Sequence, residues 1–163
     1  MKNKQEVFIE VEKFLTDRNI FIQSKEENKP WGGFFVIDDN STEKFIDSFF
    51  SNLDKNLLLQ GKISPKILLV EPNKKLSWQY HFRRSEIWNL IEGEAAIIRS
   101  KTNNEEQPIN LIQNETIMLE REERHRLVGL NDWGVVAEIW VHTDSANPSN
   151  EDDIVRIQDD FGR

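Results

Sequence analysis

The sequence predicts a mainly β protein, an antiparallel barrel or sandwich preceded by helices. After Gly61 the chain divides into short strand-like segments separated by turn residues such as Pro72-Asn73 and Asn103-Asn104. Many short strands at nearly even spacing are typical of antiparallel sandwiches and barrels. Before Gly61, apolar residues recur mainly at helical spacing instead. The two halves of the chain therefore differ in the periodicity of their apolar residues.

Two amphipathic helices are expected in the N-terminal part. Residues 3–18 place apolar side chains at helical spacing among charges, and Asn19 is a suitable end. Asn40, with Glu43 three residues later, has the form of a capping box, which predicts the start of a second helix. The apolar faces of the two helices comprise Val7, Val11, Phe14 and Leu15, and Phe45, Ile46, Phe49, Phe50 and Leu53, respectively.

Strand signals begin at residues 34–37, after a turn at 29–33, and dominate the C-terminal part. Glu92-Gly93 and Asn131-Asp132 are expected to be turns between strands. Residues 152–156 are expected to form a last helical turn. The strands expected for the barrel are 66–71, 76–81, 86–91, 94–99, 108–112, 115–119, 124–128 and 135–142.

Length and composition bound the class of protein. With 163 residues and 37% apolar content, we expect one domain, residues 1–163, with helices at 1–60 and a β-barrel and tail at 61–163. A net charge of −8 argues against nucleic acid as a partner, and the absence of cysteine excludes thiol chemistry. No apolar run approaches the ~20 residues of a membrane span, and the charged N-terminus lacks a secretory signal. We therefore expect a cytoplasmic protein with no membrane partner.

Two of the three histidines lie where strands could bring them to one metal ion. Gln79 and His81 are two residues apart, so on a strand they share a face. Glu86 follows His81 by an odd number of residues, so it joins them only if the chain turns at 82–85 and adds a second strand. His125 would complete the set from a third strand. These donors suit a borderline divalent metal, zinc first, with nickel, iron, cobalt and manganese as alternatives.

The same residues carry a resemblance to the cupin superfamily. Gln79, His81, Glu86 and Gly93 have the spacing of the first cupin motif, and His125 anchors the second. More narrowly, the C-terminal part resembles the cupin domain of type II mannose-6-phosphate isomerases, which implies a cupin-type antiparallel β-barrel (double-stranded β-helix or jelly roll) and this Gln-His-Glu-His ligand set. The narrower resemblance is carried by Lys66, Pro72, Leu76-Ser77, Gln79, His81, Arg84, Glu86, Trp88, Asn114-Glu115, His125-Arg126-Leu127 and the tail from Glu151 to Arg163.

The chain departs from that family at several positions. Phe82-Arg83 and Ile87 stand where the family commonly has histidine. Glu120 and Glu122 stand where the second motif normally has a proline and a glycine, so the turn before its histidine is altered. The helical insert at 41–60 is absent from the minimal cupin domain.

Three further residues are candidates for catalysis. Arg84 lies between the two ligand strands, and its guanidinium fork suits both a phosphate and an enediolate. Lys66 matches a lysine of the family and is expected to bind the sugar phosphate or to shuttle a proton. Glu138, on the last strand before the tail, could face inward as a general base. His142 is expected to be structural or on the surface.

The leading hypothesis is a metal-dependent aldose–ketose isomerase acting on a sugar phosphate, with interconversion of mannose 6-phosphate and fructose 6-phosphate as the main expectation. One alternative is a non-catalytic cupin that binds a sugar or sugar nucleotide, and another is a heptose-phosphate isomerase. A third is an iron oxygenase that uses His81, Glu86 and His125 as a facial triad. The aromatic content of 10% also permits a homodimer.

Overall fold

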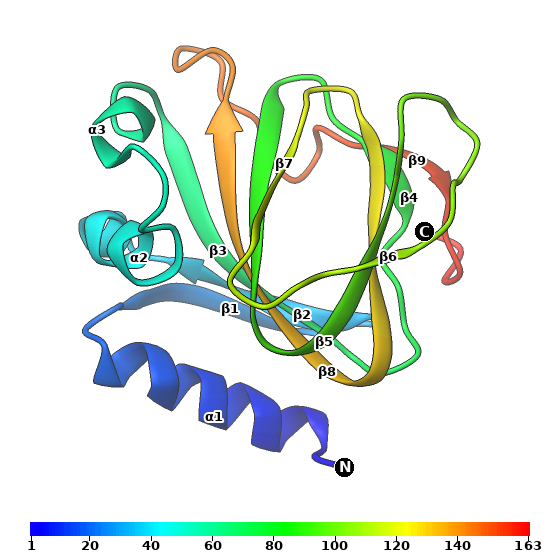
Figure 1. Cartoon of the computed structure of the whole chain (residues 1–163), viewed down its shortest axis with the longest axis horizontal. Helices are drawn as coiled ribbons and strands as arrows, with labels where there is room; N and C mark the ends of the chain where they lie inside the picture. The colour runs from blue at the N-terminus through cyan, green and yellow to red at the C-terminus, as the bar shows by residue number, and fades with distance from the viewer.

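All helices precede residue 60 in the structure, a computed structural model that describes residues 1–163, whereas strands occur throughout (Figure 1). The predicted mainly β class is thereby confirmed. From the N-terminus the elements are α1 (Lys4–Asp17), β1 (Ile22–Lys29), β2 (Gly32–Ile37), the 3₁₀ helix η1 (Asp39–Ser41), α2 (Thr42–Phe49), α3 (Lys55–Leu58), β3 (Ile63–Val70), β4 (Trp78–Tyr80), β5 (Arg84–Ser100), β6 (Ile109–Asn110), β7 (Thr116–Leu119), β8 (Arg124–His142) and β9 (Val155–Gln158).

The long strand β8 organises the antiparallel sheet. It pairs with β5 from one end to the other, and its C-terminal half pairs with β3 on the opposite side. Near its start, His125 pairs with Gln79 of β4, and β4 pairs in turn with β9. β1 and β2 extend the sheet beyond β3, while β6 and β7 pair with β5. The strands curve around a common interior, which gives the predicted antiparallel barrel (Figure 1).

The turns predicted at Glu92-Gly93 and Asn131-Asp132 are wrong, because both places lie within continuous strands. β5 and β8 stay paired on either side of them, with register shifts at Leu90/Glu92 and at Gly93/Ala95. Gly93 has a φ of +76°, and a Cβ there would lie 1.8 Å from the Trp133 carbonyl oxygen. Turn-forming residues thus mark an irregularity that bends the paired strands and does not reverse them.

The N-terminal segment is less helical than predicted. The first helix is confirmed as α1, and Asn3 and Glu6 form a capping box at its start. The capping box predicted from Asn40 is wrong, because the N-cap of α2 is Ser41, which makes no side-chain capping bond. β1 was not predicted, and with β2 it brings two strands into the supposedly helical region 1–60. None of the helices has the length and apolar character that crossing a bilayer requires.

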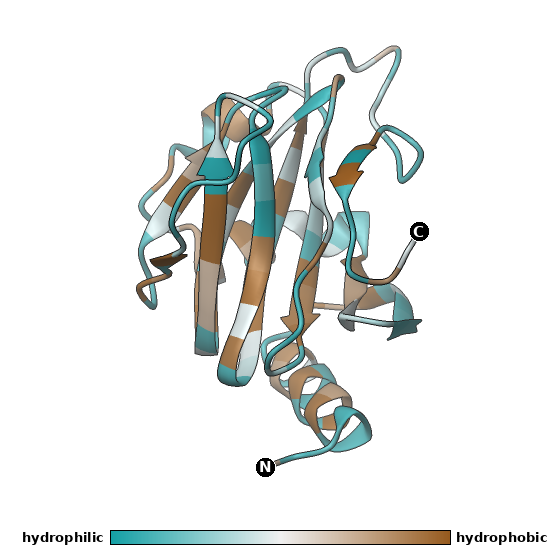
Figure 2. Cartoon of the chain, turned by 90° about the vertical axis from the view of Figure 1, so that its right-hand side faces the viewer, coloured by the Kyte–Doolittle hydropathy of each residue, from teal (hydrophilic) through white to brown (hydrophobic).

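Apolar residues form two cores, one on each side of the sheet. The first lies between the sheet and α1 and α2, which pack outside the barrel, and includes Phe8, Phe35 and Phe45. The second fills part of the barrel interior and includes Leu68, Trp88 and Val136. Figure 2 shows hydrophobic residues along the strands and in α1, and hydrophilic residues in most loops. The helices therefore cover the outside of the sheet and leave its interior face available for polar side chains.

The C-terminal tail returns to the barrel as a strand. The helical turn predicted at 152–156 is wrong, because residues from Val155 onward form β9. Within the pairing of β9 with β4, Arg156 lies opposite Gln79. The tail thereby becomes one wall of the site described next.

Candidate metal centre and adjoining pocket

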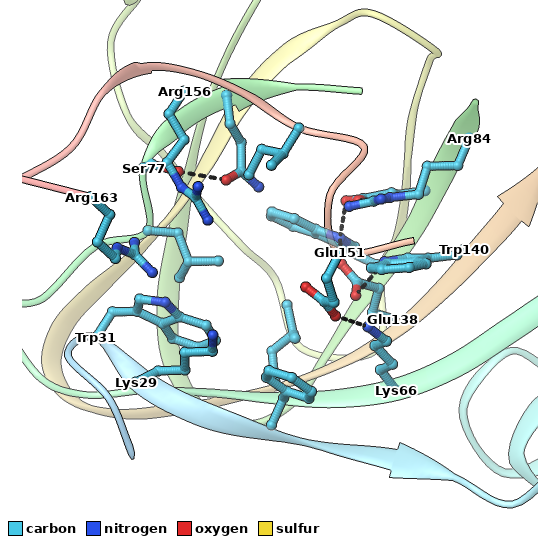
Figure 3. Close-up of a pocket in the computed structure, with 17 residues that line it drawn as sticks. Lys29, Trp31, Lys66, Ser77, Arg84, Glu138, Trp140, Glu151, Arg156 and Arg163 are labelled. Atoms are coloured by element: carbon cyan, nitrogen blue, oxygen red, sulfur yellow. Dashed lines mark hydrogen bonds and ion pairs between the residues drawn. The ribbon is translucent and has the colours of Figure 1, made fainter. Parts of the chain in front are cut away.

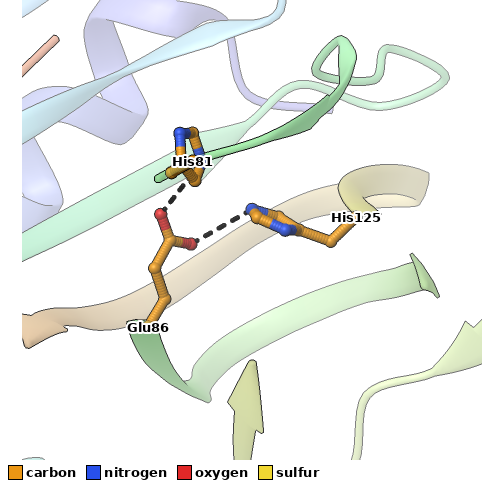
Figure 4. A group of neighbouring side chains, drawn as sticks. All are labelled: His81, Glu86 and His125. Carbon is orange, nitrogen blue, oxygen red and sulfur yellow. Dashed lines mark ion pairs between the residues drawn. The ribbon is translucent and has the colours of Figure 1, made fainter. Parts of the chain in front are cut away.

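Three strands bring His81, Glu86 and His125 together inside the barrel (Figure 4). His81 follows β4, Glu86 lies on β5 and His125 lies near the start of β8. One donor atom from each residue lies within 4.8 Å of the others. The Nε2 atom of His81 is 3.4 Å from Glu86 Oε1, and the Nε2 atom of His125 is 3.3 Å from Glu86 Oε2. The chain turns between His81 and Arg84 as the odd spacing of His81 and Glu86 required.

Backbone carbonyl groups fix the tautomers of both imidazoles. His81 Nδ1 is 2.7 Å from the Asp153 carbonyl oxygen, and His125 Nδ1 is 2.9 Å from that of Glu123. A carbonyl oxygen only accepts hydrogen bonds, so each Nδ1 carries the proton and each Nε2 presents a lone pair. The buried Nε2 of His125 has no hydrogen-bond partner. Such an orphaned acceptor is costly, and coordination of a metal ion would satisfy it.

The protonation states and spacing of the triad fit a divalent metal. Burial lowers the pKa of His81 to about 4, so the ring is neutral at neutral pH. Burial alone would raise the pKa of Glu86, but His125 and Arg84 hold it well below its usual range. Metal–ligand bonds of about 2.0–2.2 Å in a tetrahedral site place donor atoms roughly 3.4 Å apart. The two imidazoles lie 3.4 and 3.3 Å from different oxygens of Glu86, close to this value, so the triad could hold a metal ion.

Arg84 lies beside the triad as the first residue of β5. Its Nε donates to Glu86 Oε1 at 2.9 Å, and its Nη1 donates to Ser149 Oγ at 2.8 Å. Its Nη2 donates to His81 Nε2 at 3.2 Å. Its guanidinium also stacks on Trp140, with Cζ 3.5 Å from the ring centroid. A metal ion that takes the His81 lone pair therefore requires Nη2 of Arg84 to turn away.

Gln79 reaches the same region from β4. It lies opposite His125 in the sheet, so both side chains share one face. Its Oε1 accepts a hydrogen bond of 2.6 Å from Ser77 Oγ, and its side chain lines the pocket beside Glu86. The structure thus brings Gln79 near the triad, and its role as a fourth ligand stays a prediction.

Glu138 is a buried carboxyl group held between two indoles. Trp88 Nε1 and Trp140 Nε1 each donate to it at 2.9 Å. Burial, with the nearby charge of Glu86, raises the pKa of Glu138 to about 8. Lys66 lies opposite Glu138 on β3, as the pairing of the two strands requires. Glu138 is therefore a carboxyl group that can gain or lose a proton near neutral pH.

Lys66 is buried but already paired. Its Nζ forms an ion pair of 2.6 Å with Glu151, whose own side chain is largely exposed. The same ammonium lies 3.5 Å from the centroid of the Trp140 ring. Lys66 thus connects the barrel wall to the C-terminal tail.

A pocket opens from Glu86 toward solvent (Figure 3). The empty space inside it is about 620 Å³, a value that includes open solvent at its mouth. Its lining combines aromatic side chains with charges of both signs. It comprises Lys29, Trp31, Phe34, Lys66, Leu68, Leu76, Ser77, Gln79, Arg84, Glu86, Trp88, Glu138, Trp140, Glu151, Ile154, Arg156 and Arg163.

The altered second motif still delivers His125 to the site. Glu122 has a φ of +65°, in the left-handed region where glycine is favoured. Its backbone N–H donates to the His81 carbonyl oxygen at 2.9 Å, which ties the two motifs together. Glu123, whose carbonyl oxygen orients His125, is itself held by Arg99 at 2.6 Å. Side-chain contacts and a strained glutamate thus replace the family's proline and glycine in this turn.

Asp153 was not predicted as a site residue, although it stabilises the turn after His81. Its carboxylate accepts hydrogen bonds from the backbone N–H groups of Phe82 and Arg83 and from Ser149 Oγ. Burial alone would raise the pKa of Asp153, but these hydrogen bonds lower it. Only pairing of distant segments brings Asp153 here, so no local sequence pattern could reveal it.

His142 lies close to the pocket without lining it. It is buried between Ser64, whose Oγ is 2.7 Å from Nε2, and Ser149, whose backbone N–H donates to Nδ1 at 2.9 Å. Both ring nitrogens are therefore used in structural hydrogen bonds. The prediction of a structural role agrees with this position, whereas a place on the surface does not.

Comparison with protein families gives one match over most of the chain. Residues 16–159 match the family described as "Mannose-6-phosphate isomerase C-terminal".

Curated relatives are longer proteins named for sugar activation and polysaccharide synthesis. "Mannose-1-phosphate guanylyltransferase RfbM" of Salmonella typhimurium is 26% identical over 90% of this chain and 25% of its own length. "Alginate biosynthesis protein AlgA" of Pseudomonas aeruginosa is 25% identical over 85% of this chain and 23% of its own length. The chain thus spans about a quarter of the length of these relatives.

Solved structures share the fold at low sequence identity. An oxalate decarboxylase of Bacillus subtilis, OxdC, has a TM-score of 0.55 and 17% identity over 83% of this chain and 30% of its own. The vicilin of hazelnut, Corylus avellana, has a TM-score of 0.55 and 14% identity over 86% of this chain and 36% of its own. These likenesses confirm the cupin-type barrel.

Proposed function

The chain belongs to the mannose-6-phosphate isomerase C-terminal family, and from this premise we propose that it is a metal-dependent aldose–ketose isomerase that interconverts mannose 6-phosphate and fructose 6-phosphate. One observation carries the proposal: Glu86 of the candidate metal triad lines the same pocket as Glu138, a buried carboxyl whose pKa is raised to about 8. An isomerase of this class needs a base that takes and returns a proton near neutral pH, next to a group that stabilises charge on oxygen.

We assign the metal to His81, Glu86 and His125, with Gln79 as a fourth ligand. The unpartnered Nε2 of His125 and the spacing of the donors support this assignment. Two imidazoles, a carboxylate and an amide oxygen favour zinc, with nickel, iron, cobalt and manganese as alternatives. A divalent cation bound there would act as a Lewis acid toward oxygen atoms of the sugar.

Glu138 is the proposed base. Starting from the open-chain aldose, its carboxylate takes the proton from C2, and the electron pair of that C–H bond forms the C1–C2 double bond of an enediolate. The carboxyl then returns a proton to C1, while the hydroxyl proton of O2 moves to O1, which leaves the ketose. The indole N–H groups of Trp88 and Trp140 hold the carboxyl in place for both transfers.

Arg84 is proposed to stabilise the negative charge that develops on the sugar oxygens. Its position supports this role, because Arg84 lines the pocket and its guanidinium is held there over Trp140 and beside Glu86. Lys66, on the opposite strand, is proposed to assist proton transfer at Glu138. Its ion pair with Glu151 can be exchanged for a contact with a bound sugar because the Glu151 side chain is 63% exposed.

A non-catalytic cupin that binds a sugar or a sugar nucleotide is the second candidate. The names of the longer relatives favour it, because they describe guanylyl transfer and polysaccharide synthesis and not isomerisation. The contact of Arg84 with the lone pair of His81 also favours it, because the arginine competes with a metal ion for that atom.

Turnover in deuterated water distinguishes the candidates. Metal-loaded protein is incubated with mannose 6-phosphate, fructose 6-phosphate or sedoheptulose 7-phosphate and followed by proton NMR. An isomerase interconverts aldose and ketose and introduces deuterium from solvent at C1 or C2, because the proton passes through Glu138. Conversion of the heptose phosphate alone would identify a heptose-phosphate isomerase.

Glu138→Gln is the matched variant for this experiment, since it preserves the shape of the side chain and removes the base. We expect it to bind metal normally and to lose at least about 100-fold in turnover. Binding of the sugar phosphates by wild-type protein without deuterium exchange would contradict the isomerase and support the non-catalytic candidate.

A further inference from the structure

The charged side chains of the pocket are divided between its two ends. Figure 3 shows Lys66, Arg84 and Glu138 together on one side, with Glu151 beside Lys66. Lys29, Arg156 and Arg163 lie on the other side, around Trp31. All acidic residues of the pocket belong to the first side. Glu138 lies there, Glu86 is hydrogen-bonded to Arg84, and Glu151 is hydrogen-bonded to Lys66. The lining of the second side therefore has no acidic residue.

The cations at the two ends also differ in whether they are neutralised. Arg84 is paired with Glu86 at 2.9 Å and Lys66 with Glu151 at 2.6 Å. The side chains of Lys29 and Arg156, by contrast, form no ion pair and no hydrogen bond, while Arg163 is paired with Asp159 at 2.8 Å. In a chain of net charge −8, carboxylates are abundant, yet none approaches Lys29 or Arg156.

The fold directs Arg156 toward the site and not away from it. Arg156 lies opposite Gln79 in the pairing of β9 with β4, and Gln79 lies opposite His125 in the pairing of β4 with β8. Directly opposed residues of neighbouring strands project from the same face of a sheet. Arg156 therefore belongs to the row of side chains that contains a proposed metal ligand, and it lines the pocket.

Lys29 and Arg163 reach the same end from separate elements. Lys29 ends β1, and its ammonium lies 6.0 Å from the ring centroid of Phe34 on β2. Arg163 is oriented by Asp159, which accepts from its Nε and Nη2 and leaves Nη1 without a hydrogen bond. Two guanidinium groups and an ammonium thus converge from the first strand, the last strand and the tail.

We propose that Lys29, Arg156 and Arg163 form a subsite for the terminal phosphate monoester of an open-chain sugar phosphate. A guanidinium group binds two phosphate oxygens at once through parallel hydrogen bonds. An ammonium group adds a positive point charge, which attracts the two negative charges of a phosphate monoester. This inference rests on the proposed function for its sugar portion. If the carbonyl carbon of the sugar lies at Glu138, a phosphate bound at the other end of the pocket must be attached to the far end of the carbon chain. A sugar 1-phosphate places its two ends wrongly for this pocket.

Binding of inorganic phosphate to the metal-free protein tests the subsite without catalysis. The probe is titrated against wild type, Arg156→Gln and Lys29→Gln, and the dissociation constant is measured by ³¹P NMR. Each variant should weaken binding about tenfold or more, because a charge-assisted hydrogen bond is lost. Arg156→Lys, which keeps the charge without the fork, should fall between wild type and Arg156→Gln.

Arg121→Gln is the matched control, since Arg121 is an exposed arginine outside the pocket. It should bind phosphate as wild type does. Equal dissociation constants for wild type, Arg156→Gln and Lys29→Gln would overturn the subsite. A nucleoside-diphosphate sugar that binds more tightly than mannose 6-phosphate and loses its affinity in Arg156→Gln would overturn the assignment to a monoester.

Kinetics with mannose 6-phosphate separate this inference from the proposed function. If the protein isomerises the sugar, Arg156→Gln should raise KM about tenfold and change kcat much less, because the phosphate lies far from the reacting carbons. Turnover with an unchanged KM in Arg156→Gln would refute the subsite and leave the isomerase intact. Phosphate binding that depends on Arg156 in a protein without turnover would support the subsite and refute the isomerase.

Discussion

The two faces of the sheet formed by β3, β8 and β5 differ in that buried charged side chains lie on one of them, although the same strands supply both. The face toward α1 and α2 is apolar and includes Ile67, Ile87, Ala137 and Ile139. The face toward the barrel interior carries Lys66, Arg84, Glu86, Glu138 and His142, all buried, with Trp88 and Trp140 between them. Alternation along each strand is what separates the two sets.

This contrast indicates a division of labour between the faces. Burial of large apolar side chains on the outer face stabilises the fold by about 1.5–3 kcal/mol for each. Buried charges on the inner face are costly unless they are paired, and even paired they add little net stability. The charges of the interior are thus better explained by chemistry than by folding. Substitutions on the two faces should therefore affect different measurements.

Phe8→Ala should have the largest effect on stability. Phe8 on α1 is buried against Phe35, with ring centroids 5.2 Å apart. Its truncation should lower the free energy of unfolding by about 3–5 kcal/mol, as measured by urea denaturation. Ile9→Ala is the control, because Ile9 follows on the same helix but is 59% exposed. An equal loss in both variants would contradict the packing of α1 through Phe8.

His125→Leu should break the metal centre and spare the fold. Mutation of a residue that only supports a metal ligand lowers metal affinity by about 10–100-fold. Removal of a ligand itself should therefore lower metal affinity by more than about 100-fold. The metal-free protein should lose little stability, because removal of the unpartnered Nε2 offsets the loss of the hydrogen bond from Nδ1 to the Glu123 carbonyl oxygen. Metal content by elemental analysis and urea denaturation provide the two measurements. His142→Asn, which alters a histidine outside the triad, should keep the metal; a loss there and not in His125→Leu would refute the assignment.

Arg84→Gln should separate metal binding from turnover within the interior face. Metal affinity should stay equal or rise, because a cation that contacts His81 and Glu86 is removed. Turnover of the sugar phosphate should fall about 100-fold, as for the loss of one donor to a developing negative charge. Calorimetric metal titration and a coupled assay measure the two effects. A variant that loses its metal would instead make Arg84 a support for the ligands.

The smallest expected effect is a pH dependence of stability that comes from Glu138. Its pKa is raised to about 8 in the folded protein from a usual value of 4.5. The folded state therefore holds this proton more tightly than the unfolded state does. Its contribution to stability is fully present below pH 4.5 and is lost as the pH rises through 8.

Urea denaturation of metal-free wild type and Glu138→Gln between pH 6.5 and 8 isolates this contribution, because every other titrating group is common to the two proteins. The free energy of unfolding of wild type should fall by up to about 1.4 kcal/mol per pH unit. Glu138→Gln should show a flatter dependence. Parallel curves for the two proteins would mean that Glu138 titrates at its ordinary pKa.

Sequence patterns with local causes predicted much of the fold. The helix from residue 4, the strand at 34–37 and the place of the barrel strands follow from periodicity and turn residues, and the structure contains them. The sequence does not predict β1, because it is a half-exposed edge strand with a polar sequence. The turn predicted at Glu92-Gly93 is wrong because glycine occurs at irregularities within paired strands as well as at turns that reverse the chain.

The candidate site was predictable only where spacing encodes geometry. The separations of Gln79, His81 and Glu86 required a turn and two strands, and the structure contains both. Arg156 and Asp153 were missed because their positions depend on the pairing of the tail with β4. A helical turn is predicted at 152–156, so the sequence does not predict β9, the strand that brings Arg156 into the pocket.

The dependence of the site on β8 has a consequence for biosynthesis. A ribosome that has completed β4 and β5 has already made His81 and Glu86, but these strands pair with β8 and not with each other. The nascent chain can therefore not complete this centre until the strand that contains His125 has emerged from the exit tunnel. Because long-range pairing of this kind forms slowly, binding of a metal ion at these residues would be a late event in maturation.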